Sequence, residues 1–134
     1  AKVMYGLSRQ VAEAELLWRE GKPRDAVAIL RKATTVEHNL IYTEPPSWMI
    51  PVRHAMGAIQ LTSGDALGAE ATYREDLKRP PANARGLLGL HQTLTSLGRH
   101  AEADALKPRL DRAWARADVT PPASCYCGVL GERH

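Results

Sequence analysis

Several residue types and patterns are scarce in this sequence, and each scarcity argues against a class of protein. The 134 residues include no phenylalanine, and aromatic residues make up only 5%. Val, Ile and Tyr never alternate with polar residues over a useful stretch, so a β-sheet architecture is disfavoured. No apolar run approaches the roughly 20 residues that cross a bilayer, and no secretory signal pattern opens the chain. We therefore expect a cytoplasmic protein with no membrane partner.

The charged residues show no sign of a nucleic-acid interface. Lys and Arg total 18 against 15 Asp and Glu, which gives a net charge of +3. Acidic residues stand among the basic ones, as in Arg74-Glu75-Asp76, whereas nucleic-acid binders concentrate basic residues on one face. Phosphate-binding loops, dinucleotide-binding loops, serine-hydrolase elbows and helical zinc-peptidase motifs are all missing. We expect no nucleic-acid partner, no cofactor and no enzymatic activity.

The sequence instead contains a repeated pattern of helix, turn and helix. Apolar residues recur every three or four positions before each of three glycines, and an alanine follows five residues after each glycine. These pairs are Gly21 with Ala26, Gly64 with Ala69, and Gly98 with Ala103. The last two glycines are 34 residues apart, and the first two are 43 apart, which is 34 plus an insertion of nine. A helix-turn-helix period of 34 is typical of tetratricopeptide repeats.

This pattern predicts an all-α fold with three antiparallel helix pairs and an irregular C-terminal tail. The predicted helices cover residues 2–20, 23–37, 48–63, 66–79, 84–97 and 100–116. The repeat domain would span 1–117, with units at about 3–37, 48–81 and 84–117, an insertion at about 37–50, and the tail at 118–134. Asp76 stands where such a repeat usually has a small residue. Pro108 is expected to kink or split the last helix.

The chain resembles the tetratricopeptide repeat family over about residues 3–117. A narrower resemblance, to the C-terminal part of bacterial tetratricopeptide proteins of unassigned function, is carried by four segments. They are Glu44-Pro45-Pro46-Ser47-Trp48, Pro51-Val52-Arg53, Tyr73-Arg74-Glu75-Asp76-Leu77 and Ala113-Trp114-Ala115-Arg116-Ala117-Asp118. The resemblance implies a repeat scaffold, no reaction, and a chain that is the end of a longer protein. It also implies that the helix pairs stack into a short right-handed superhelix, with a concave groove lined by the first helix of each pair.

Counting back from the turn glycines places candidate binding residues in this implied groove. They are Trp18, Arg19, His54, Arg85 and Gln92, with Trp48 and Arg53 at a lip formed by the insertion. Arginine can hold a carboxylate through two hydrogen bonds, which favours an acidic or C-terminal peptide segment as ligand. The primary hypothesis is a protein–protein interaction module without catalysis. Alternatively, these side chains are solvated, and the aromatic residues of the insertion fill a gap between helix pairs.

The tail supports a hypothesis of a different class. Cys125 and Cys127 are the two cysteines of the chain, and a Cys-x-Cys pair can bind Cu(I) or Zn(II) through thiolates. Two thiolates do not complete a tetrahedral site, so His134 or a second copy of the chain would supply the remainder. A strained disulfide and a pair of free thiols are the other possibilities. The alternative function is a soft-metal or redox module docked by the repeats, and exposed repeat ends also permit a homo-oligomer.

Overall fold

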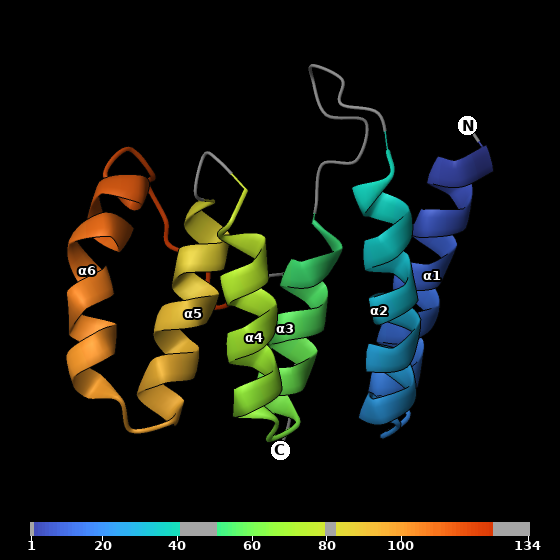
Figure 1. Ribbon diagram of the computed structural model, residues 1–134, viewed down its shortest axis with the longest axis horizontal. Helices are drawn as coiled ribbons and strands as arrows, with labels where there is room; N and C mark the ends of the chain where they lie inside the picture. Colours follow the sequence, from blue (N-terminus) through green and yellow to red (C-terminus); the bar gives the residue numbers. More distant parts are fainter. Residues whose placement is uncertain (1, 41–50, 80–82, 125–134) are drawn as a thin grey trace.

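The computed structural model describes residues 2–40, 51–79 and 83–124, which form six α-helices and no strand. Consecutive helices lie side by side as three antiparallel pairs, which are arranged in a row (Figure 1). The predicted all-α class and the predicted number of helices are confirmed for these ranges. The helices are α1 (Lys2–Arg19), α2 (Pro23–His38), α3 (Val52–Thr62), α4 (Ala66–Asp76), α5 (Ala84–Ser96) and α6 (His100–Trp114).

Each pair is closed by a glycine with a left-handed backbone. In all three turns the glycine N–H donates to the carbonyl three residues earlier, and the next N–H donates to the carbonyl five residues earlier. This is the Schellman arrangement, which requires a positive φ that glycine adopts without strain. The φ values are 79° at Gly21, 89° at Gly64 and 73° at Gly98. The alanine that follows each turn by five residues is buried, so the sequence pattern corresponds to one packing unit used three times.

A side chain of the first helix pair caps the N-terminus of α3, the first helix of the second pair. The carboxylate of Glu37, near the end of α2, accepts the backbone N–H of Val52 at 3.0 and 3.2 Å. Val52 is the first residue of α3, and Pro51 before it is extended, with φ −56° and ψ 132°. The prediction that this helix already includes Pro51 was therefore wrong. Burial raises the pKa of the Glu37 carboxyl, and the Val52 N–H acts in the opposite direction.

Two other helix predictions need correction. The helix α4 ends at Asp76, three residues before the predicted end at residue 79. The helix α6 continues from His100 to Trp114 with Pro108 inside it, so of the kink or split expected at this proline the split is wrong. Pro108 is exposed, and water at such a position can satisfy the helix carbonyl that a proline leaves without a donor.

The apolar interior consists of two clusters, each spanning adjacent helices. One joins α1, α2 and α3 around Leu7, Leu30 and Ile59, and the other joins α4, α5 and α6 around Tyr73 and Leu94. After α6 the chain turns back and runs behind α5 in Figure 1, whereas α4 lies in front. Residues 117–124 of this returning tail contain neither helix nor strand. Residues 117–124 and α4 thus lie on opposite faces of the α3–α5 layer.

Candidate functional site

The side chain of Tyr73 passes from α4 between α3 and α5 and reaches the face on which the tail lies. It is almost fully buried. Two glycines provide the space: a Cβ placed on Gly57 of α3 would lie 2.5 Å from Tyr73 Cζ, and one on Gly89 of α5 would be closer still. The absence of a side chain at Gly57 thus lets the ring lie directly against the backbone of α3. Gly89 performs the same task on the opposite side of the ring.

The far end of this ring anchors the tail through Ser124. The Tyr73 hydroxyl lies 2.5 Å from Ser124 Oγ, and Ser124 Oγ donates to the backbone carbonyl of His54 at 2.9 Å. Because the serine proton is used on that carbonyl, the Tyr73 hydroxyl is the donor to Ser124. Burial raises the pKa of Tyr73 to about 12, so the phenol keeps this proton at neutral pH. Ser124 is itself only 1% exposed, so the chain is packed against the α3–α5 layer at this residue.

A second contact fixes the tail two residues earlier. The side-chain Nε2 of Gln92 on α5 donates to the backbone carbonyl of Pro122 at 2.8 Å. The tail consequently crosses α5 at Pro122 and reaches α3 at Ser124. Gln92 was predicted to line a groove for a partner, and in the structure it holds a segment of its own chain.

His54 forms a buried pair with Asp76 of α4. Its Nε2 lies 2.9 Å from Asp76 Oδ2, and the two side chains are 0% and 7% exposed. Gly86 of α5 leaves room for this carboxylate, because a Cβ there would lie 2.5 Å from Asp76 Oδ2. The other ring nitrogen, Nδ1, is also buried, and it has no hydrogen-bond partner among the described residues. The expectation that His54 lines an open groove does not fit this burial. Asp76, which stands where such a repeat usually has a small residue, is the hydrogen-bond partner of this ring.

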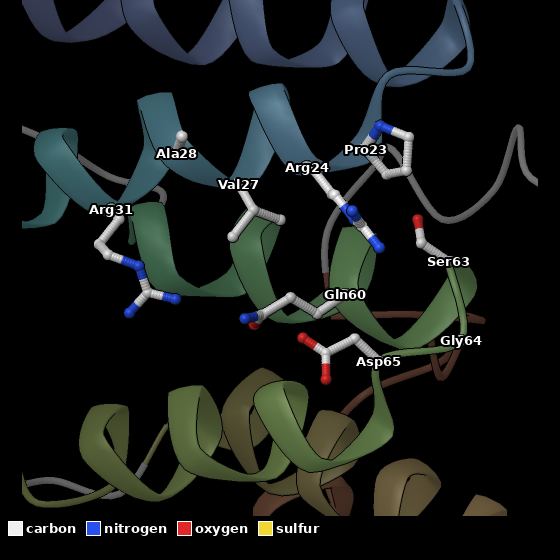
Figure 2. A pocket seen from close by; sticks show the side chains of 9 residues that line it. All are labelled: Pro23, Arg24, Val27, Ala28, Arg31, Gln60, Ser63, Gly64 and Asp65. Carbon is white, nitrogen blue, oxygen red and sulfur yellow. The ribbon is translucent and has the colours of Figure 1, made fainter.

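An open trough lies between α2 and α4, with α3 as its floor (Figure 2). It consists of two adjoining hollows of about 650 and 290 Å³, which share Arg31, Gln60 and Asp65. Figure 2 shows Arg24 and Arg31 extending from α2 on either side of Val27, with the amide of Gln60 and the carboxylate of Asp65 farther from α2 in the same hollow. We call this surface the α2–α4 trough.

The two walls of the α2–α4 trough carry opposite charges. Arg24 and Arg31 are exposed on the α2 wall, and within the described part of the chain neither is in an ion pair. The α4 wall carries the carboxylates of Asp65 and Glu75. One oxygen of the Asp65 carboxylate is already used within the chain. Its Oδ1 accepts the backbone N–H of Gly68 at 2.9 Å and so caps α4.

The floor of the trough carries the side-chain amide of Gln60, which is held in one orientation, and the guanidinium of Arg53. Gln60 is 2% exposed, and its Oε1 accepts a hydrogen bond from Thr72 Oγ1 at 2.6 Å. Its NH₂ group is therefore the end that remains for a ligand. Arg53, a predicted binding residue, is half-buried in the smaller hollow.

The structure does not bring the other predicted binding residues together. Trp18 is half-buried against the first apolar cluster, and Arg19 is exposed at the end of α1. Arg85 is half-buried in the first turn of α5, where its backbone N–H donates to Asn83 at 2.8 Å. Trp48, Cys125 and Cys127 lie outside the described residues. The expected binding set is thus divided between the tail face, the trough and the ends of helices.

Sequence reasoning missed the residues that form the walls of the trough. The spacing of Arg24, Val27 and Arg31 at i, i+3 and i+7 places them on one face of a helix, and this signal was available. Ser124 had no comparable signal, because it lies 51 residues from Tyr73 in a tail without periodicity.

No family model matches the sequence, and neither the curated proteins nor the solved structures contain a match. Among the helices described here, none is long and apolar enough to cross a membrane. Within the same residues, no group of three or more His, Cys, Asp or Glu side chains lies close enough together to hold a metal ion.

Proposed function

We propose that this chain is a protein-interaction module that holds an extended acidic segment of a partner in the α2–α4 trough. The observation that carries the proposal is the cationic wall of α2, with two arginines on one helix face aimed across an open trough. The scaffold in this proposal is a short right-handed superhelix of tetratricopeptide type. Its support is the recurrence of one Schellman turn and one buried alanine in each helix pair.

The trough is a better surface for a partner than the face of α3 and α5. That face already holds the tail, through Gln92 with Pro122 and through Ser124 with Tyr73. A partner binding there would have to displace a buried residue and its hydrogen bonds. The trough needs no such displacement, since the described residues leave it open along the length of α2 from Pro23 to Thr34.

The spacing of the trough's donors fits a particular kind of segment. Arg24 and Arg31 are seven residues apart on a helix, which is about 10.5 Å along its axis. Two acidic side chains four residues apart on an extended peptide are separated by about 13 Å, which two flexible arginines can span. Val27 between the arginines favours an apolar residue at the centre of the segment, and the Gln60 NH₂ offers a donor to its backbone. The carboxylates of Asp65 and Glu75 disfavour further acids on the side toward α4.

The test is direct binding of a labelled peptide with the sequence Glu-Ser-Val-Ser-Glu, followed by fluorescence anisotropy at low and high salt. We expect binding that weakens with salt, because the pairs are near the surface. The double variant Arg24→Gln, Arg31→Gln should bind about tenfold more weakly or worse, given the strength of charge-assisted hydrogen bonds. The matched control is Arg9→Gln, Lys32→Gln, which changes the net charge equally at exposed positions outside the trough.

The comparison peptide Gln-Ser-Val-Ser-Gln distinguishes recognition of the acidic side chains from non-specific binding. The proposal requires the parent chain to prefer the acidic peptide and the control variant to retain that preference. Equal affinity for both peptides, an equal loss in both double variants, or no binding by the folded parent would each refute it.

A further inference from the structure

One face of α1 is exposed although the matching faces of α3 and α5 are buried where one helix pair packs on the next. Three positions define this face, and they stand twelve, nine and five residues before the turn glycine of each pair. In α3 they are Val52, Ala55 and Ile59, and in α5 they are Gly86, Gly89 and Thr93, all buried. In α1 they are Arg9, Ala12 and Leu16, all exposed. The helix α1 stands at one end of the row of pairs (Figure 1), so within the described chain its face has no neighbouring pair to cover it.

The contact between α4 and α5 shows which side chains meet such a face. A Cβ on Gly89 would clash with the ring of Tyr73, and one on Gly86 would lie 2.5 Å from Asp76 Oδ2. Tyr73 and Asp76 stand nine and twelve residues after Gly64, the turn glycine that precedes α4. A position before one turn glycine therefore faces the position at the same distance after the preceding turn glycine.

The contact between α2 and α3 has residues that suit the same register. Leu30 and Ala33 stand nine and twelve residues after the turn glycine Gly21, and both are buried in the apolar cluster that includes Ala55 and Val52. The register places Leu30 at the level of Ala55 and Ala33 at the level of Val52, so a large side chain meets a small one at each level. The buried alanine five residues after each turn glycine completes the pattern.

The exposed face of α1 keeps the sizes of such a contact and adds a positive charge. Ala12 supplies the small position, and Leu16, the large apolar one, is 62% exposed. Arg9 stands at the level where α5 accommodates the carboxylate of Asp76, and among the described residues it has no ion pair. Tyr5, which is 75% exposed, extends the face by one turn. We call Tyr5, Arg9, Ala12 and Leu16 the α1 stripe.

We infer that the α1 stripe binds an amphipathic helix of a partner chain with the pattern Ala-x-x-x-Leu-x-x-Glu. In the register of the internal contacts, the alanine lies against Leu16, the leucine against Ala12 and the glutamate at Arg9. A second copy of this chain is a poorer occupant, because α6, at the other end of the row, has Lys107 at the level of the leucine and Leu110 at that of the glutamate. This inference is independent of the proposed function, because the trough and the α1 stripe share no residue.

The probe is a synthetic peptide with the sequence of residues 22–38 and the substitution Ala33→Glu, which gives the required pattern from Ala26 through Leu30. A side-chain bridge between positions 28 and 32, both exposed in α2, keeps this short peptide helical. It is titrated into the ¹⁵N-labelled full chain, and the amide shifts report where it binds. We expect the shifts to be confined to α1.

Two leucines of similar exposure supply the variant and its matched control. Leu16→Glu removes an apolar contact from the α1 stripe and should weaken peptide binding by about tenfold or more. Leu67→Glu makes the same change on α4, where the leucine is 69% exposed, and should bind as the parent does. Because both positions are exposed, both variants should fold.

A reversal of charge tests the register. Arg9→Glu should weaken binding of this peptide about fivefold, and a second peptide with Ala33→Lys should restore it. The inference is overturned if the parent shows no shift on α1 at millimolar peptide, if the two leucine variants lose binding equally, or if the Arg9→Glu variant does not distinguish the peptides. Shifts on α1 that arise on concentrating the chain alone would also overturn it, because the occupant would then be a second copy.

Discussion

The hydroxyl of Tyr73 on α4 is 2.5 Å from the hydroxyl of Ser124 in the tail, across the layer formed by α3 and α5. This contact joins residues 51 positions apart and passes between two glycines, Gly57 and Gly89. The Tyr73 side chain therefore connects α4, the second helix of the second pair, to the segment that follows the third pair. The position of the tail depends on the second and third pairs packing correctly.

Tyr73→Phe should lower the free energy of unfolding by about 1 kcal/mol, because it removes one buried hydrogen bond and leaves the ring in place. The serine hydroxyl keeps its bond to the His54 carbonyl, which limits the loss. Urea unfolding followed by circular dichroism measures the difference. Tyr5→Phe is the control, since Tyr5 is 75% exposed on α1 and the substitution should change nothing measurable. Equal effects at the two tyrosines would contradict the role of the Ser124 contact.

Gly57→Ala should destabilise the chain by about 1–3 kcal/mol, the usual range for adding a methyl group to a filled interior. The new Cβ would lie 2.5 Å from Tyr73 Cζ, in a ring that Gly89 confines from the other side. Gly6→Ala is the matched control in α1, where nothing lies within 4 Å of the new Cβ. That variant should gain about 0.5–1 kcal/mol from helix propensity alone. Thermal melts compare the two, and a Gly57→Ala variant that gains stability would disprove the close packing.

The helix pairs could be predicted from sequence because their determinants are local. A left-handed turn requires glycine at one position, and an alanine on the next helix lies at a fixed distance from it, as Gly64 and Ala69 show. The spacing of apolar residues then defines which face of each helix is buried. For these reasons the three turns were correctly predicted.

The sites depended on contacts that no spacing specifies. Counting from Gly64 placed His54 on a groove-facing helix. It could not show that the His54 ring is buried and hydrogen-bonded to Asp76 on another helix. Asp76 was recognised as unusual, and that departure was the one signal of the pair. The tail has no periodicity, so nothing indicated that Ser124 reaches Tyr73. The α2–α4 trough depends on the packing of the first two pairs, which the pattern within each pair does not determine.

The carboxylate of Glu70 makes part of the stability dependent on pH. It accepts from Arg74 of its own helix at 2.8 Å and from Arg99, at the start of α6, at 2.6 Å. The hydrogen bond from Arg74, and then that from Arg99, hold the pKa of this carboxyl below its ordinary value of 4.5. Stability from a depressed acid pKa is present above 4.5 and is lost as the pH falls through the lower folded-state value.

Glu70→Gln should therefore reduce the free energy of unfolding at pH 7 by about 1 kcal/mol or less, since its partners are partly solvated. The gap between parent and variant should close as the pH is lowered below 4.5. Urea denaturation at a series of pH values measures this gap. Glu13→Gln, at an exposed position on α1, should give no such trend. A gap that stays constant with pH would rule out the two arginine contacts as its source.

The last prediction concerns Asp65, which both caps α4 and places a negative charge in the α2–α4 trough. Asp65→Asn keeps an acceptor for the Gly68 N–H, and Asn is as good as Asp at this position, so stability should change by only a few tenths of a kcal/mol. The lost charge no longer opposes an acidic segment, so the affinity for Glu-Ser-Val-Ser-Glu should rise, and its neutral analogue should bind as before. Asp65→Ala separates the two roles, because it removes the same charge but costs about 1 kcal/mol of stability with the cap. Anisotropy measures the affinity of both variants for the peptide, and urea titration measures their stability. We expect tighter binding in both variants and destabilisation only in the alanine variant. Unchanged affinity in the asparagine variant would show that ligands do not approach this wall.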